Sequence, residues 1–265
     1  NEAIQQYYTL PISKELFLRS SSMNSSRRDD KNVPGINKIR FSGNSDRFGA
    51  VDSSGRLHLW HFSTDPVSYN PYSTILCDAE SASDLAFLNG SSSVVATVGE
   101  DKQTSLCLWD TLLPVRSRLV AAVPGLGVVS DGGFAALTES GGITSLLPLP
   151  GGSERMLVAG GSDGSVKIFD TRMLSRGGHI RLQSAMSPME SGRKVRRGSR
   201  ITSMSYCLHS GRLATASRDG DAFVWDDIIG GVGGRATAVM MHGCSNMEPL
   251  SHQGVAWMEN GKLLT

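Results

Sequence analysis

The chain has 265 residues, a formal net charge of +1, 30 glycines and few aromatic side chains. This length is enough for one sizeable all-β domain, and abundant glycine suits short strands joined by tight turns. The near-neutral charge argues against a global attraction to nucleic acid or anionic membrane, and no apolar run approaches the roughly 20 residues of a membrane-spanning helix. No signal-peptide pattern opens the chain. The four cysteines lack paired metal-ligand spacing, which favours reduced structural thiols in a cytosolic protein.

The first 35 residues are expected to stand apart from the rest of the chain. They contain one apolar segment, Glu15–Arg19, which predicts a strand, and a polar low-complexity stretch over residues 20–35, which predicts a flexible loop. The chain begins at Asn1 without a Met and stops at Thr265 within an incomplete unit. We therefore expect it to be part of a longer polypeptide, with an N-terminal region over residues 1–35 and a repeat domain over residues 36–265.

From residue 36 onward one pattern recurs. Three alternating apolar segments predict antiparallel strands, the third ends in an aromatic residue that is usually followed by Asp, and a fourth, outer strand comes next. The first two units comprise INKIRF, RFGAVD, LHLWHF and an outer strand within Ser73–Asp78, then SDLAFL, VVATVG, SLCLWD and SRLVAAV.

The third unit is the least regular. A stretch of 19 residues precedes its first segment, ITSLLPL, and Pro148 and Pro150 close that segment, where proline fits only at a strand end. The remaining segments are clear: RMLVAGG, SVKIFD and HIRLQSA in the third unit; ITSMSYC, RLATASR, DAFVWDD and RATAVMMH in the fourth; GVAWME and KLLT, joined by an Asn-Gly turn, in the fifth.

This recurrence resembles the WD-repeat signature, and a WD repeat is one blade of a β-propeller. The resemblance implies an all-β WD-repeat propeller of which about four and a half blades are visible, as part of a seven-bladed ring. The Gly-His pair that usually precedes the inner strand is mostly missing, and Ser251-His252 is its only fair stand-in. The residues that carry the repeat are Trp60, Trp109, Asp110, Asp163, Phe169, Asp170, Asp219, Trp225 and Asp226.

These repeat residues are predicted to be structural rather than catalytic. Asp163 and Asp219 each precede a glycine, Gly164 and Gly220, that can adopt positive φ without penalty. Their carboxylates can accept hydrogen bonds from nearby backbone N–H groups and so cap the turn. The aromatic residues are expected to pack between blades.

Two segments carry a more specific resemblance. SLCLWDTLLP, Ser105–Pro114, together with RFGAVDSSGRLHLW, Arg47–Trp60, resembles the C-terminal WD-repeat region of the rabconnectin or DmX-like family, whose yeast relative is the large subunit of the RAVE complex. The resemblance implies a large cytosolic protein, associated peripherally with acidic endomembranes. Its implied role is to help assemble the peripheral sector of the vacuolar-type proton pump (V-ATPase) onto the membrane sector, and so to regulate vacuolar acidification. It implies no catalytic residue, no metal and no cofactor.

One basic segment, SGRKVRRGSR, joins an outer strand to the next inner strand, and such connections lie on a propeller face that commonly binds partners. Its cations are candidates for binding an acidic protein partner or anionic headgroups, with a solvated loop and a nuclear-localisation or nucleic-acid patch as alternatives. The absence of interleaved aromatic residues argues against single-stranded nucleic acid. The candidate residues are Arg193, Lys194, Arg196, Arg197 and Arg200.

Three functional hypotheses follow. The first is a non-catalytic interaction scaffold in proton-pump assembly that binds peripheral-sector subunits and other assembly-complex subunits, without membrane insertion. The second is a generic WD-repeat adaptor in ubiquitin ligation or vesicle trafficking. The third is a propeller enzyme, which would need convergent titratable groups with shifted pKa values in its central channel. The Gly-rich runs lack the Lys-Ser/Thr ending of a P-loop, and the histidines lack metal-ligand spacing.

Overall fold

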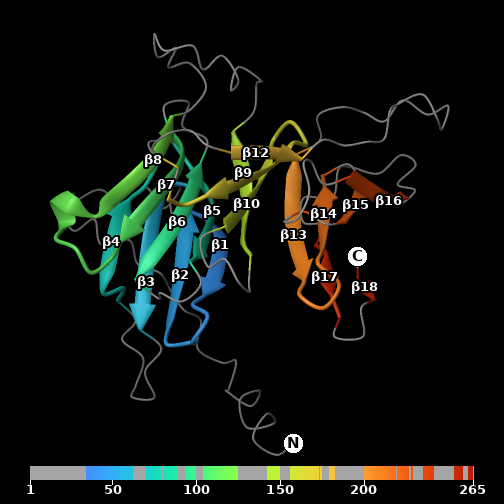
Figure 1. Ribbon diagram of the computed structural model, residues 1–265. Coiled ribbons are helices and arrows are strands. Elements are labelled where there is room, and N and C mark those ends of the chain that lie inside the picture. The colour runs from blue at the N-terminus through green and yellow to red at the C-terminus, as the bar shows by residue number, and fades with distance from the viewer. Residues whose placement is uncertain are drawn as a thin grey trace, which may run out of the picture.

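In the residues that it describes, the computed structural model contains four four-stranded antiparallel sheets and one two-stranded sheet, which follow one another in chain order (Figure 1). The all-β blade architecture predicted from the sequence is confirmed. The structure describes residues 34–61, 70–78, 80–88, 93–99, 104–124, 142–149, 156–172, 174, 179–182, 200–218, 220–226, 228, 235–241, 254–258 and 262–264.

Each sheet is a meander whose strands pair in the order in which they occur along the chain. The first blade contains β1 (Ile36–Phe41), β2 (Arg47–Asp52), β3 (Arg56–His61) and β4 (Ser73–Leu76). The second contains β5 (Ala82–Phe87), β6 (Val94–Gly99), β7 (Thr104–Asp110) and β8 (Leu119–Pro124), with the short 3₁₀ helix η2 (Val115–Ser117) between its last two strands.

The third blade contains β9 (Ile143–Pro148), β10 (Met156–Gly161), β11 (Val166–Asp170) and β12 (His179–Leu182). The fourth contains β13 (Ile201–Cys207), β14 (Arg212–Ser217), β15 (Asp221–Asp226) and β16 (Arg235–Met241). The two-stranded sheet consists of β17 (Ala256–Trp257) and β18 (Leu263–Leu264).

The strands lie where the sequence pattern predicts them, with ends that differ by a few residues. The outer strand expected within Ser73–Asp78 is found there and ends at Leu76, because the backbone N–H groups of Cys77 and Asp78 both donate to the carbonyl of Gly55, at 2.9 and 3.0 Å, instead of continuing the ladder. Pro148 is the last residue of β9, the strand-end position that proline tolerates. The strand expected at Glu15–Arg19 and the loop over residues 20–33 lie outside the described residues.

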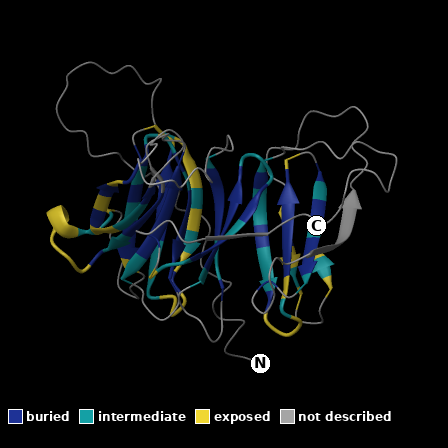
Figure 2. Cartoon of the chain, turned by 45° about the horizontal axis from the view of Figure 1, so that its top comes forward, coloured by how far each residue is buried: buried dark blue, intermediate teal, exposed yellow. Residues whose placement is uncertain are grey.

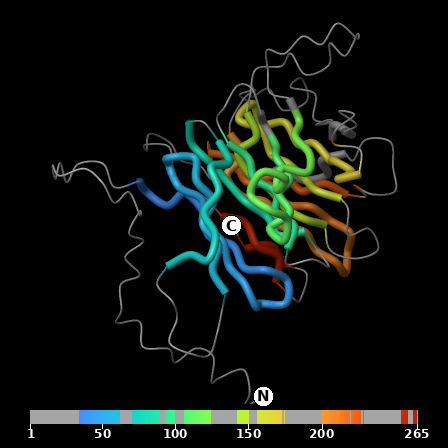
Figure 3. Tube along the Cα trace, turned by 90° about the vertical axis from the view of Figure 1, so that its left-hand side faces the viewer, coloured from blue at the N-terminus to red at the C-terminus, as the bar shows by residue number. Residues whose placement is uncertain are grey.

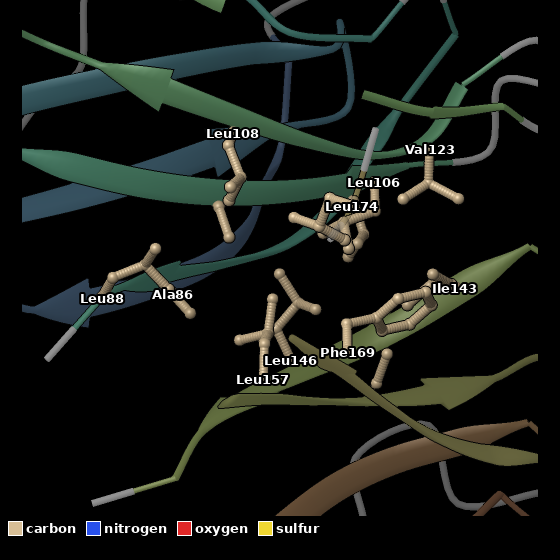
Figure 4. Close-up of a cluster of buried hydrophobic side chains, with 13 residues drawn as sticks. Ala86, Leu88, Leu106, Leu108, Val123, Ile143, Leu146, Leu157, Phe169 and Leu174 are labelled. Carbon is tan, nitrogen blue, oxygen red and sulfur yellow. The ribbon is translucent and has the colours of Figure 1, made fainter. Parts of the chain in front are cut away.

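The blades pack face to face, and their first strands β1, β5, β9, β13 and β17 each contact the next in this order. The packing between the second and third blades is drawn in Figure 4, where Leu106 and Leu108 of β7 face Leu146 of β9 and Phe169 of β11. Fully burying one such side chain stabilises the fold by about 1.5–3 kcal/mol. The blade interfaces therefore form the hydrophobic core of this protein.

Polar bonds connect the same inner strands. Asn37 Nδ2 of β1 donates to the carbonyl of Ala82 at 2.7 Å, and Thr144 Oγ1 of β9 donates to the carbonyl of Ile201 at 2.7 Å. At the last junction the backbone N–H of Trp257 donates to Ser205 Oγ at 3.1 Å. Each blade is thus held to its neighbour both by apolar packing at its faces and by hydrogen bonds along its inner strand.

One face of the first blade is uncovered among the described residues. In the β-ladder, Ile39 occupies the same position as Leu85, Leu146 and Met204 of the next three blades. Ile39 is 51% exposed, whereas its three counterparts are 0%, 1% and 6% exposed. The counterparts are covered because each has a preceding blade: Leu85, for example, packs so closely on Gly49 that a Cβ there would lie 2.8 Å from Leu85 Cδ1.

Candidate functional site

The turns between the second and third strands share one backbone conformation. Gly55, Gly164 and Gly220 have φ of +75°, +77° and +93°, a region that glycine enters without steric cost. In the third blade Asp163 Oδ1 accepts hydrogen bonds from the backbone N–H of Ser165 at 2.9 Å and from its hydroxyl at 2.5 Å. This geometry is that of a turn cap. Asp219, the equivalent residue of the fourth blade, lies outside the described residues.

The first blade caps this turn with a residue that sequence reasoning missed. Asp52 is buried at the end of β2, and its Oδ1 accepts bonds from the backbone N–H groups of Ser54 and Arg56 at 2.9 and 3.0 Å. Its Oδ2 lies 2.9 Å from His58 Nε2. Burial raises the pKa of Asp52, but the bonds from His58, Arg56 and Ser54 outweigh it and hold that pKa below its usual range. The signal in the sequence was an Asp two residues ahead of Ser-Gly.

Asp52, His58 and Thr74 form a hydrogen-bonded chain that superficially resembles a catalytic triad. His58 Nδ1 lies 3.2 Å from Thr74 Oγ1 on the neighbouring strand β4. The carboxylate of Asp52 is already committed to the β2–β3 turn through its other oxygen, and His58 and Thr74 are opposite each other in the ladder. The chain therefore ties the turn to the outer strand, which is a structural task.

The third-strand aromatic residues follow a rule that only the structure reveals. Trp109 Nε1 donates to Thr97 Oγ1 at 2.8 Å, and Trp225 Nε1 donates to Thr215 Oγ1 at 3.2 Å. In the first and third blades the position of the threonine is occupied by alanine, at residues 50 and 159. There Trp60 stacks on Phe48, with ring centroids 4.9 Å apart, and Phe169 has no N–H to satisfy. The indoles of Trp109 and Trp225 therefore have a hydroxyl acceptor, and Trp60 has an aromatic stacking partner.

The acidic residues that end the third strands are engaged locally. Asp110 Oδ1 accepts from the backbone N–H of Leu112 at 3.0 Å, Asp170 accepts from the backbone N–H of Arg172 at 2.9 Å, and Asp226 Oδ1 pairs with Arg212 Nε at 2.7 Å. Asp170 also forms an ion pair with the Arg172 guanidinium. The contacts of Asp110 and Asp170 lie where β7 and β11 end, and that of Asp226 pairs β15 with the neighbouring β14. They give the three carboxylates structural partners rather than a shared site.

Among the described carboxylates Asp84 is the most buried, and sequence reasoning did not single it out. Its side chain is 1% exposed and lies 3.1 Å from Arg40 Nη2. It accepts further bonds from the backbone N–H groups of Leu146 and Leu85, at 2.9 and 2.8 Å. A polar residue inside the apolar segment SDLAFL was the available signal. With these partners the carboxylate joins three inner strands, β1, β5 and β9.

Of the predicted basic segment, only Arg200 is among the described residues; Arg193, Lys194, Arg196 and Arg197 lie outside them. The carbonyl of Arg200 accepts from the backbone N–H of Arg218 at 2.8 Å. The equivalent bonds of the first and third blades join Ser53 to Gly35 and Ser162 to Gly142, both at 2.9 Å. Arg200 therefore lies at the end of the sheets that carries the turns at Gly55, Gly164 and Gly220, which we call the turn face.

The described cysteines are structural. Cys77, Cys107 and Cys207 are buried free thiols. Burial raises the pKa of Cys77 to about 12, and its Sγ donates to the carbonyl of Gly55 at 3.2 Å. Within the described parts of the chain, no cluster of His, Cys, Asp and Glu side chains could hold a metal ion, and no helix is long and apolar enough to cross a membrane.

Comparison with known proteins agrees with this architecture. The family model for the WD domain, G-beta repeat, matches residues 135–170 and 192–226, which include the first three strands of the third and fourth blades. The chain is 32% identical to DmX-like protein 1 of Mus musculus over 143 residues and 30% identical to DmX-like protein 1 of Homo sapiens over 141 residues.

The chain contains WD repeats and is similar to the DmX-like proteins over half of its length. This confirms both the partial WD-repeat propeller and the resemblance to the rabconnectin or DmX-like family. The matches cover 52% and 51% of this chain but 4% of the length of each relative, so the chain spans a small part of the proteins it resembles. WD repeats mediate protein–protein interactions. The described repeat carboxylates, Asp110, Asp163, Asp170 and Asp226, all have hydrogen-bond partners within the chain, which is consistent with such a scaffold.

Proposed function

We propose that this chain is a non-catalytic interaction scaffold that helps to assemble the vacuolar-type proton pump by binding subunits of its peripheral sector. The similarity to DmX-like protein 1 over half of the chain carries the proposal, because the resemblance of Ser105–Pro114 and Arg47–Trp60 to the same family implies this role. The protein would act in the cytoplasm, associated peripherally with acidic endomembranes and with the other subunits of an assembly complex.

A non-catalytic role is supported by the state of the buried acids. Asp84 is enclosed by Arg40 and two backbone N–H groups, and Asp52 is committed to a turn and to His58. A general acid or base must have a free position at which to exchange a proton with substrate. Neither carboxylate has such a free position, which favours a scaffold over a propeller enzyme. The proposed scaffold role requires no cofactor or metal.

The basic segment at residues 193–200 is the proposed contact for the acidic surface of a partner. Five cations within eight residues are a concentrated positive charge on a nearly neutral chain. Exposed charge pairs contribute only about 0.2–1 kcal/mol each. The segment should therefore raise the rate of association and the salt sensitivity of binding more than it holds the complex together.

The test is a binding titration against purified peripheral sector, at low and at physiological salt. One variant changes Arg193, Lys194, Arg196 and Arg197 to Ser, and a control variant changes Arg27, Arg28 and Lys31 to Ser. We expect a moderate loss of affinity for the first variant, concentrated at low salt, and none for the control. If the first variant and the unchanged protein bind with equal affinity at both salt concentrations, the contact is refuted. If the unchanged protein binds no peripheral-sector subunit, the pump role is refuted, and a generic WD adaptor in ubiquitin ligation or vesicle trafficking is favoured.

A further inference from the structure

A group of apolar side chains stands in solvent at the outer rim of the second blade. Leu112 and Val115, in the connection between β7 and β8, are 72% and 76% exposed, and the neighbouring apolar residues are exposed as well. Figure 2 shows this connection as the exposed coil at the left edge of the molecule. We call the apolar residues of this connection, together with the first two residues of β8, the apolar knob; it comprises Leu112, Leu113, Val115, Leu119 and Val120. Such concentrated apolar exposure marks a site of interaction.

The backbone of the knob is held in one conformation by hydrogen bonds. The N–H of Asp110 donates to the carbonyl of Arg118 at 2.8 Å and closes the base of the connection. The N–H of Thr111 donates to the carbonyl of Ser93 at 2.8 Å, and the N–H of Ser117 donates to that of Pro114 at 2.8 Å. Because the backbone is fixed, the apolar side chains are held outward. A preformed surface loses little conformational entropy on binding.

Arg118 fastens the knob to the first blade. Its Nη1 donates to Ser73 Oγ of β4 at 2.6 Å, and its Nε donates to the carbonyl of Leu113 at 3.0 Å. The guanidinium thus bridges an outer strand of one blade and the connection of the next. The knob is therefore a rigid projection of two blades rather than a loose loop of one.

The charge beside the knob is positive and uncompensated. Arg116 is exposed in η2, and no residue that the structure describes forms an ion pair or hydrogen bond with its side chain. Arg118 is bonded to neutral oxygens alone among the described residues. Asp110, at the base of the connection, accepts a hydrogen bond from the backbone N–H of Leu112 through its Oδ1. A complementary surface would therefore supply carboxylates at its margin.

We propose that the apolar knob docks into an apolar groove with an acidic rim on a partner protein. The knob projects from the sheets on the left of Figure 1, and Figure 3, seen from that side, shows this green segment in front of them. A projection fits a groove, which disfavours two-fold pairing of the knob with itself. A membrane surface is disfavoured because the knob has no Trp or Tyr, two cations add only about 1 kcal/mol each, and a single weak signal does not anchor a protein stably.

The first experiment is site-specific photo-crosslinking in the complete polypeptide in its own cells. A benzophenone amino acid replaces Val115 or, as the control, Leu208, which is comparably exposed in the turn between β13 and β14. We expect Val115, but not Leu208, to crosslink to one distinct protein. A crosslink within the same chain, a crosslink to a second copy, or no crosslink at Val115 would overturn the proposal.

The second experiment measures binding of the crosslinked protein to purified variants. Leu112→Ser combined with Val115→Ser should weaken binding by roughly tenfold or more, the scale of losing central apolar contacts. Arg116→Glu should weaken it as well, and a Glu→Lys change on the rim of the partner's groove should restore it. All three positions are exposed, so melting temperatures should equal that of the unchanged protein. Undiminished binding by the double variant would refute docking through the knob.

A third experiment, with lipid vesicles, distinguishes binding to a protein partner from binding to a membrane. The unchanged protein is sedimented with phosphatidylcholine vesicles that contain or lack phosphatidylserine, and we expect no sedimentation in either case. Sedimentation that requires Leu112 and Val115 would mean that the knob binds lipid, and the proposed protein partner would be wrong. None of these results depends on the proton pump. The docking proposal can therefore be refuted while the proposed function stands, and the proposed function can be refuted while the docking proposal stands.

Discussion

The guanidinium of Arg40 and the carboxylate of Asp84, 44 positions apart in sequence, form an ion pair of 3.1 Å that joins the first two blades. The same carboxylate accepts the backbone N–H of Leu146, 62 positions further on, at 2.9 Å. One buried side chain thus connects three blades at their inner strands. Because such a group satisfies donors from separate elements, its loss should affect the whole assembly of sheets rather than one turn.

Replacing Asp84 by Ala should therefore lower the free energy of unfolding by about 2–4 kcal/mol, since buried backbone donors lose their acceptor. Arg40 keeps access to water, so its lost ion pair adds little to this cost. Chemical denaturation of the purified chain measures the effect. Glu80→Ala removes an exposed carboxylate nearby and should change stability by less than about 0.5 kcal/mol. Equal stabilities of the two variants would mean that Asp84 is not a structural link.

Asp52 should make stability depend on pH. Its pKa in the folded state lies below the ordinary value of 3.8, so the unfolded chain binds the proton more tightly. The stabilisation is complete above the unfolded pKa and is lost as the pH falls through the folded pKa. In Asp52→Asn, the free energy of unfolding should fall less steeply with pH below 3.8 than in the unchanged protein. Urea titrations at a series of pH values would check this, and parallel profiles would contradict it.

The uncovered face of the first blade can be probed with a position-matched pair. Leu85→Ala should destabilise the chain by about 2–5 kcal/mol, the usual cost of truncating a fully buried leucine. Ile39→Ala, at the same ladder position one blade earlier, should cost less than about 1 kcal/mol because that side chain is already half in water. Thermal unfolding of both variants measures the difference. Similar losses would show that residues outside the described ranges cover Ile39.

The Trp225–Thr215 hydrogen bond should appear as coupling in a double-mutant cycle. Thr215→Val leaves the indole N–H buried without its acceptor and should cost about 1–3 kcal/mol. Combining it with Trp225→Phe, which gives an apolar pair without an indole N–H as Ala159 and Phe169 do in the third blade, should cost less than the sum of the single changes, by about 0.5–1.5 kcal/mol. Additive effects would indicate that the hydrogen bond is not formed in solution.

Much of the fold could be predicted from the sequence because the underlying signals are local. Strand alternation has a period of two residues, and the turns at Gly55, Gly164 and Gly220 need a residue that adopts positive φ at low cost. The aromatic residue at the end of each third strand marks the repeat. These features depend on neighbours within a few positions, so the order and number of the described blades followed from them.

The candidate interaction surfaces were only partly foreseeable. The segment Ser105–Pro114 had a sequence distinctive enough to suggest a family, and the structure adds that its last two leucines, Leu112 and Leu113, are exposed. The backbone around them is fixed by hydrogen bonds to the carbonyls of Ser93 and Arg118. Exposure depends on which strands cover a residue, which local pattern does not report. The predicted roles of the four cations over residues 193–197 remain predictions, since that part of the segment lies outside the described residues.

The sequence by itself therefore determined the all-β class, most of the strands, the turn glycines and the resemblance to the DmX-like family, because each depends on residues close together in the chain. Only the tertiary structure decided which polar residues act between blades. Asp84, Asp52 and Thr144 resemble ordinary strand residues in the sequence, and their partners come from other strands or blades. The free energy of a buried polar group is set by whether donors from distant segments reach it. These donors and acceptors come within hydrogen-bond distance only when the blades have packed together.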